Sequence, residues 1–386
     1  MPVFCCCFVL CLQVAVPLGE LDLLPLANLH SLEALLVNAH NPTFFQPLVS
    51  AQLAAGLTAL THLGISGCPL SCLSRIGSCV ALKSVRLVCP GDHEQELGLS
   101  EWAALGKLTG LTELVLQNAR MLACTEEVSA AMSKLVKLRG FDAELWCVGM
   151  VSALAFCTQL TYLGGGWQQD GSSVSGVTLP HVMVLRNTFG SPPFAALPNL
   201  VIVEQLSCID TYAFAAMARH CTKLRFFESV RAPLISSTLP KHMPYTGPTR
   251  DRTAAVMALS ALTRLSHLEF MIETPAELVA LVDAVDTLLP HGFRHLEVYV
   301  IGSSSVRLGT LTQLAKLRGL PYLILQLDSE SADHMVQDAE GFLSGLSGIQ
   351  RVHVMGLSSE HVAACVAAQH EIEEAGLPCP KSLTIS

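Results

Sequence analysis

Charged residues are scarce in this sequence, and aromatic residues are scarcer still. Only 14% of its 386 residues are Asp, Glu, Lys or Arg, and only 6% are Phe, Trp or Tyr. The charges sum to a formal net charge of -9, so the chain lacks the excess of Lys and Arg that holds a phosphate backbone. We therefore expect no nucleic-acid partner.

The cysteines lack the spacing of a structural metal site or a small disulfide framework. Fifteen cysteines are scattered along the chain. Cys68 and Cys72 come closest to a metal-binding pair, but no second pair or neighbouring His doublet completes four ligands. We expect reduced thiols that pack as small hydrophobic groups in a reducing compartment. The sequence predicts no metal and no cofactor.

Sequence motifs of catalysis are also lacking. Residues 291–295 (HGFRH) do not have the HExxH arrangement, and residues 164–167 (GGGW) lack the GK[ST] ending of a phosphate-binding loop. No Gly-x-Ser-x-Gly elbow is present. We expect that the chain is not an enzyme.

The N-terminus carries an apolar run, Val3 to Val16. Its length suits a secretory signal, but no Lys or Arg precedes it and no clear cleavage site follows. The alternatives are a buried first strand or helix, a truncated start, or acylation of cysteines within the run, which would tether the chain to a membrane and is not favoured. The predicted organisation is an apolar N-terminal segment, 1–19, followed by 20–386.

What the chain has in abundance is a repeated apolar phrase, Leu-x-x-Leu-x-Leu with a further apolar residue three positions upstream. The clearest copies are LTALTHLGI (57–65), LTGLTELVL (108–116), LTRLSHLEF (262–270) and LRGLPYLIL (317–325). Weaker copies are anchored at Leu32, Leu82, Leu138, Leu160, Leu200, Leu224, Phe293 and Ile349. The repeats are mostly 22–30 residues long, a period that is typical of a solenoid.

This pattern resembles the leucine-rich-repeat family, over nearly the whole chain. The resemblance implies an α/β solenoid, or horseshoe, with a concave parallel sheet and a mostly helical convex side. Residues 274–289 read as one convex helix, with Thr274 as its cap and Glu277 three residues later, and residues 126–135 and 211–221 read as others. The ninth repeat position departs from the family's usual Asn or Cys, so the repeats are degenerate.

One insertion interrupts the rhythm, from Ala232 to Arg252. It contains four prolines, which disfavour the interior of helices and strands. The stretch reads as a loop that carries Lys241, His242, Arg250 and Arg252. A functional loop and an unconstrained insertion both remain open.

The candidate site follows from strand alternation, which directs every second side chain away from the core. Adjacent repeats place a column of carboxylates there, Glu204, Glu228, Glu269 and Glu297. A flanking column holds Phe226, His267, His295 and Tyr322, and Trp167 is a further candidate anchor for a partner. Stacked carboxylates favour a protein or peptide partner with basic side chains. The alternative is an ordinary solvated surface.

We therefore expect a non-enzymatic protein–protein interaction scaffold or substrate-recognition module, which binds a protein or peptide on its concave face. The expected location is the cytoplasm, where relatives of this α/β type include cytoskeletal or axonemal scaffolds. One alternative is a secreted or membrane-tethered recognition protein of the same family. Another is a fragment of a larger leucine-rich-repeat adaptor or sensor.

Overall fold

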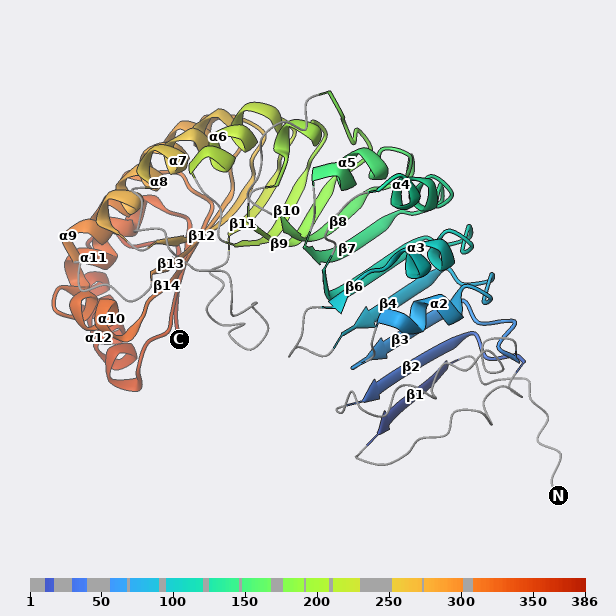
Figure 1. Ribbon diagram of the computed structural model, residues 1–386. Coiled ribbons are helices and arrows are strands. Elements are labelled where there is room, and N and C mark those ends of the chain that lie inside the picture. Colours follow the sequence, from blue (N-terminus) through green and yellow to red (C-terminus); the bar gives the residue numbers. More distant parts are fainter. Residues whose placement is uncertain are drawn as a thin grey trace, which may run out of the picture. The chain divides into compact units, whose positions relative to one another are not determined.

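The chain folds into two compact units, each built from repeats that contribute one strand apiece. The computed structural model describes residues 11–16, 30–39, 56–67, 70–89, 95–120, 125–145, 148–167, 176–190, 192–207, 211–229, 252–272, 274–300 and 308–386. Among these, the first unit extends to Leu197 and the second begins at Pro198. In each unit, helices lie along one side of the strands, as Figure 1 shows.

The first unit is a parallel sheet with short helices. Its strands are β1 (Cys11–Val16), β2 (Ala34–Ala39), β3 (His62–Ser66), β4 (Ser84–Val88), β5 (Gln95–Glu96), β6 (Glu113–Arg120), β7 (Gly140–Leu145), β8 (Tyr162–Trp167) and β9 (Val184–Gly190). They pair in sequence order, except that β4 pairs directly with β6 and β5 pairs with β6 beside it. The helices are η3 (Leu70–Cys72), α2 (Leu73–Ile76), α3 (Leu99–Leu105), α4 (Glu126–Met132), α5 (Val148–Leu154) and η4 (Phe194–Ala196).

The second unit repeats this plan with longer helices. Its parallel strands, in sheet order, are β10 (Ile202–Ser207), β11 (Phe226–Ser229), β12 (His267–Ile272), β13 (His295–Val300), β14 (Tyr322–Gln326), β15 (Arg351–Met355) and β16 (Ser382–Ile385). The helices are α6 (Thr211–His220), α7 (Thr253–Ala258), η6 (Leu259–Ala261), α8 (Pro275–Leu288), η7 (Leu289–His291), α9 (Leu308–Leu311), η8 (Thr312–Lys316), α10 (Ser329–Val336), α11 (Ala339–Gly345), η9 (Leu346–Gly348) and α12 (Ser359–Glu374).

The repeat leucines form the core, as the sequence predicts. In the first unit Leu63, Val85 and Leu114 are register partners on neighbouring strands, and each is buried. In the second unit Leu268 pairs with Leu296 in the same way. Because side chains alternate across a strand, the residues between these leucines lie on the face of the sheet that the core does not fill, which we call the open face.

A backbone ladder holds successive repeats in this register. The carbonyl of Lys83 accepts hydrogen bonds from the N–H groups of Thr112 and Glu113, at 2.7 and 3.0 Å. The carbonyl of Thr112 accepts in the same way from Arg139 and Gly140. Each repeat thus accepts hydrogen bonds from the backbone N–H groups at the start of the next repeat's strand.

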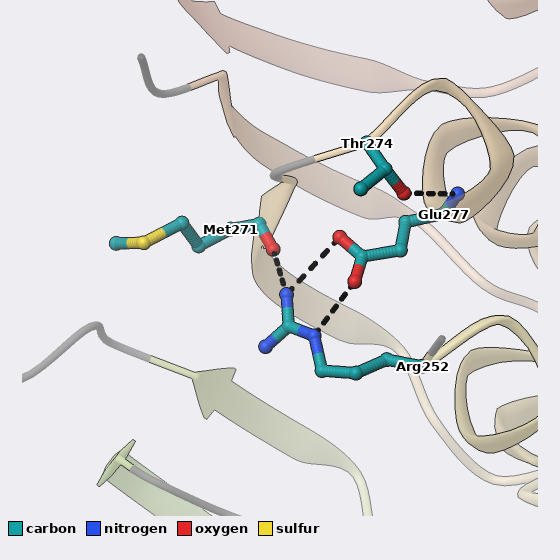
Figure 2. Close-up of polar contacts among 4 residues, drawn as sticks. All are labelled: Arg252, Met271, Thr274 and Glu277. Atoms are coloured by element: carbon teal, nitrogen blue, oxygen red, sulfur yellow. Dashed lines mark hydrogen bonds and ion pairs between the residues drawn. The ribbon is translucent and has the colours of Figure 1, made fainter. Parts of the chain in front are cut away.

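The predicted helix at 274–289 is confirmed as α8, and its first turn is tied to the preceding helix. The Thr274 hydroxyl accepts from the Glu277 N–H at 3.2 Å. The Glu277 carboxylate accepts from Arg252 Nε at 2.8 Å and from Arg252 Nη2 at 3.2 Å, and Nη2 also donates to the Met271 carbonyl at 3.0 Å (Figure 2). Arg252, the last residue of the predicted insertion, therefore joins α7 to α8.

Two sequence predictions fall wholly or partly outside the described residues. Of the predicted insertion, only Arg252 is described. Of the N-terminal segment, only 11–16 is described, as β1, which pairs in parallel with β2. No helix within the described residues is both long enough and apolar enough to cross a membrane.

Candidate functional site

A row of rings crosses the open face of the second unit. Phe226, His267, His295 and Tyr322 are successive register partners on β11 to β14. Their ring centroids lie 6.0, 5.3 and 4.7 Å apart along the row, and the two imidazoles are stacked. We call these four residues the ring row. The structure brings together all four residues that the sequence groups here.

A row of carboxylates lies beside the ring row, two residues further along each strand. Glu228, Glu269 and Glu297 are register partners on β11, β12 and β13. All three side chains are partly exposed. We call them the glutamate row.

Glu204, the fourth predicted member of the column, lies where the register of β10 and β11 is irregular. The pairing of β10 with β11 shifts between Val203 and Leu206. Within this interval Gln205 has a φ of 55°, a left-handed conformation that only a minority of non-glycine residues adopt. Val203, the residue before Glu204, still pairs with Phe227, so the alignment of Glu204 with Glu228 stays a prediction.

Charge crowding in the glutamate row acts most strongly on its middle member. Burial, together with the charges of Glu228 and Glu297, raises the pKa of Glu269 from 4.5 to about 7. A carboxyl that is half protonated near neutral pH responds to any nearby charge, and an approaching cation favours its ionised form. When a cation binds to the glutamate row, Glu269 can therefore release its proton and become negatively charged.

Tyr299 adds a hydroxyl group to this polar surface, and it is not among the residues predicted from the sequence. Its hydroxyl donates to Glu297 Oε1 at 2.7 Å. Burial and the neighbouring carboxylates raise the pKa of Tyr299, so its hydroxyl stays protonated and available as a donor. The signal for this residue is the same period-two alternation, because Tyr299 follows Glu297 by two positions on β13.

The imidazole of His295 lies next to the glutamate row. Its Nε2 is 3.9 Å from Glu297 Oε2. Burial is the main reason that the pKa of His295 is lowered, and the adjacent His267 lowers it further. At neutral pH His295 is therefore predominantly a neutral ring that does not cancel the carboxylate charge.

Trp167 does not have the exposure that a partner anchor needs. It is the last residue of β8 and its exposed fraction is 5%, so the structure corrects its assignment to a binding surface. Trp102, in α3, is likewise buried.

The register decides the fold. Every strand of both units is parallel to its neighbour, and the repeated leucine positions align from strand to strand with helical returns between them. The chain is a leucine-rich-repeat solenoid. This confirms the predicted α/β fold class, with its parallel sheet and mostly helical returns.

Comparisons with known proteins give leucine-rich-repeat structures at low identity. An internalin (inlF) from Listeria monocytogenes is 16% identical over 91% of this chain and 86% of its own, with a TM-score of 0.38. Internalin C2 from the same organism is 18% identical over 53% of this chain and 74% of its own, with a TM-score of 0.32. A chain of the mouse RP105/MD-1 complex is 14% identical over 97% of this chain and 51% of its own, with a TM-score of 0.36.

No family model matches the sequence, and no curated protein matches it either.

Proposed function

We propose that this leucine-rich-repeat protein is a non-enzymatic scaffold whose second unit binds a basic segment of a protein or peptide across the glutamate row. The observation that carries the proposal is the unbroken register of Glu228, Glu269 and Glu297 on three adjacent strands. Parallel strands are about 4.8 Å apart, a spacing that lets neighbouring carboxylates share one guanidinium or ammonium group.

The surroundings of the row support a cationic ligand. Arg and Lys side chains combine a charge with a long apolar stem, and the ring row offers that stem, or the flat face of a guanidinium, a stacking surface. Ionising Glu269 in the free protein is opposed by its two acidic neighbours. A bound cation offsets that repulsion between the carboxylates, and this relief contributes to the free energy of binding.

A peptide titration tests the proposal on the full chain. The probe is a fluorescein-labelled peptide of alternating arginine and serine, and binding is followed by fluorescence anisotropy at two salt concentrations. The test variant replaces the whole glutamate row, with Glu228→Gln, Glu269→Gln and Glu297→Gln. The matched control neutralises three exposed helix carboxylates, with Glu340→Gln, Glu360→Gln and Glu371→Gln.

We expect the test variant to weaken binding by about tenfold, since each charge pair contributes roughly 0.5 kcal/mol and three are removed. The control variant loses the same formal charge and should stay within about twofold, because distant exposed charges are screened. Equal losses in both variants would show that only net charge attracts the peptide and would overturn the proposed site.

The proposed location is the cytoplasm, and secretion is the alternative. Cys157 and Cys365 are buried free thiols, and burial raises the pKa of both. Buried protonated thiols suit a reducing compartment. Alkylation of the protein from unreduced cell extract, followed by mass spectrometry, should find these two thiols unoxidised after unfolding. Their recovery as disulfides would favour the secreted alternative.

A further inference from the structure

A polar pocket opens on the sheet of the first unit, where no site is predicted from the sequence. Its volume is about 510 Å³, and it lies over β4, β6, β7, β8 and β9. The charged and aromatic residues that line it are Arg86, Arg139, Arg186, Glu113, Asp142 and Tyr162. We call it the arginine pocket.

Strand register sets the arginines around a central acid. Arg86, Val115, Asp142, Gly164 and Arg186 are successive partners across five strands of the sheet. Each arginine thus stands two strands from Asp142, about 10 Å away at the backbone. That separation lets both guanidinium groups reach toward the space above Asp142.

Asp142 itself is held within the sheet surface and is only 6% exposed. The Tyr162 hydroxyl donates to Asp142 Oδ2 at 3.1 Å. Burial raises the pKa of Asp142, while Tyr162, Arg86 and Arg186 act in the opposite direction. The guanidinium carbon of Arg186 also lies 5.8 Å from the centre of the Tyr162 ring, within the range of a cation–π contact.

Two glycines make room for the side chains of Asp142 and Tyr162. A Cβ on Gly164 would lie 2.6 Å from Asp142 Cγ and 2.7 Å from the Tyr162 hydroxyl oxygen. A Cβ on Gly140 would lie 3.2 Å from Tyr162 Cδ1. Neither glycine has a left-handed φ. These positions therefore need glycine for space and not for its backbone conformation.

We infer that the arginine pocket binds a carboxylate side chain of an acidic peptide segment. Three guanidinium groups face two carboxyl groups there, and one of these, Asp142, already accepts a hydrogen bond from Tyr162. The surplus charge is positive, and planar guanidinium groups match a carboxylate with two parallel hydrogen bonds. The ligand is opposite in charge to the one proposed for the glutamate row, and the two inferences rest on different residues.

The first experiment measures an acidic probe with the full chain. The probe is a labelled peptide of alternating glutamate and serine, and the variants are Arg86→Gln, Arg186→Gln and the pair together. Lys107→Gln is the matched control, because Lys107 is an exposed cation of the same unit outside the pocket. We expect about tenfold weaker binding for each single arginine variant and no more than about twofold for the control. Equal binding by all variants would overturn the inference.

The sign of the ligand charge is tested separately with Asp142→Asn, which removes a negative charge but keeps an oxygen for Tyr162. We expect the acidic peptide to bind severalfold more tightly to this variant. Weaker binding would mean that Asp142 contacts a cation and would contradict the inference. Circular dichroism and thermal melting of each variant confirm that the fold is retained.

A competition arm distinguishes carboxylate from phosphate, since arginine binds both. Glutarate and inorganic phosphate are added at equal ionic strength. Displacement of the peptide by glutarate supports the inference. Displacement by phosphate at much lower concentration than by glutarate would identify a phosphate site and overturn it.

Discussion

The two units use the same one-strand repeat, yet the side chains on their open faces differ in kind and in charge. In the first unit, arginines and the buried Asp142 line a pocket, and glycines at 140 and 164 make room for Asp142 and Tyr162. In the second unit, the corresponding alternate positions carry rings and carboxylates that stand in rows. The difference shows that the leucine positions determine the fold, whereas the residues between them determine what the surface can bind.

The largest effect is expected where the second unit relies on a buried ion pair. The side chain of Glu277 is 4% exposed and that of Arg252 is 23% exposed. Arg252→Ala leaves the buried carboxylate without its charged partner and should lower the free energy of unfolding by about 3–5 kcal/mol. Urea unfolding followed by circular dichroism measures this change.

Lys316→Ala is the control for that prediction. Lys316 Nζ lies 3.9 Å from Asp283 Oδ1, and about half of each side chain is exposed. Its loss should cost less than about 1 kcal/mol. If the two substitutions cost the same, burial does not distinguish these ion pairs.

The next effect tests whether the two interiors are equivalent. Leu114 in β6 and Leu296 in β13 are both fully buried at the same repeat position. Replacing either with Ala should cost about 2–5 kcal/mol through lost burial and a residual cavity. Hydrogen exchange monitored by mass spectrometry should show the loss of protection in the substituted unit. A negligible cost in only one unit would show that the two hydrophobic cores are not equivalent.

The smallest effect is a pH dependence that we expect in the second unit. Burial and the neighbouring carboxylates raise the pKa of Glu269 from 4.5 to about 7. The folded chain then binds more protons than the unfolded chain between these values, so this group's stabilising contribution falls as pH rises through the window. Glu269→Gln should be more stable than the parent above about pH 7, by on the order of 1 kcal/mol after allowance for solvent screening.

Urea unfolding at about pH 5 and about pH 8 measures that dependence, with Glu340→Gln on the exposed surface of α11 as the control. The same titration predicts that the arginine–serine peptide binds severalfold more tightly at the higher pH, because Glu269 is then ionised. A parent protein whose stability and affinity show no Glu269-dependent change would contradict the crowded-carboxylate account.

Much of this architecture is predictable from the sequence because it depends on period and alternation alone. The leucine phrase predicts the buried rows, and alternation predicts that Phe226, His267, His295 and Tyr322 align. The Thr274 cap is predictable for the same local reason, since a hydroxyl before a helix accepts from an N–H three residues later.

The remaining features depend on three-dimensional detail that no local pattern reports. The register shift between β10 and β11 lies at the left-handed backbone of Gln205, and the sequence around it has no glycine to signal it. The burial of Trp167 depends on how the end of β8 packs. In the arginine pocket, Asp142 and Tyr162 occupy the space that side chains at positions 140 and 164 would take, which is evident only once these neighbours are placed.

We expect the two open faces to bind opposite charges independently, and one crossed binding experiment can separate them. The acidic and the basic peptide are each titrated into the parent protein, the glutamate-row variant and the Arg86→Gln, Arg186→Gln double variant. The glutamate-row variant should lose only the basic peptide, and the arginine variant should lose only the acidic one. If each variant instead affects both peptides alike, the two surfaces are not separate sites for opposite charges.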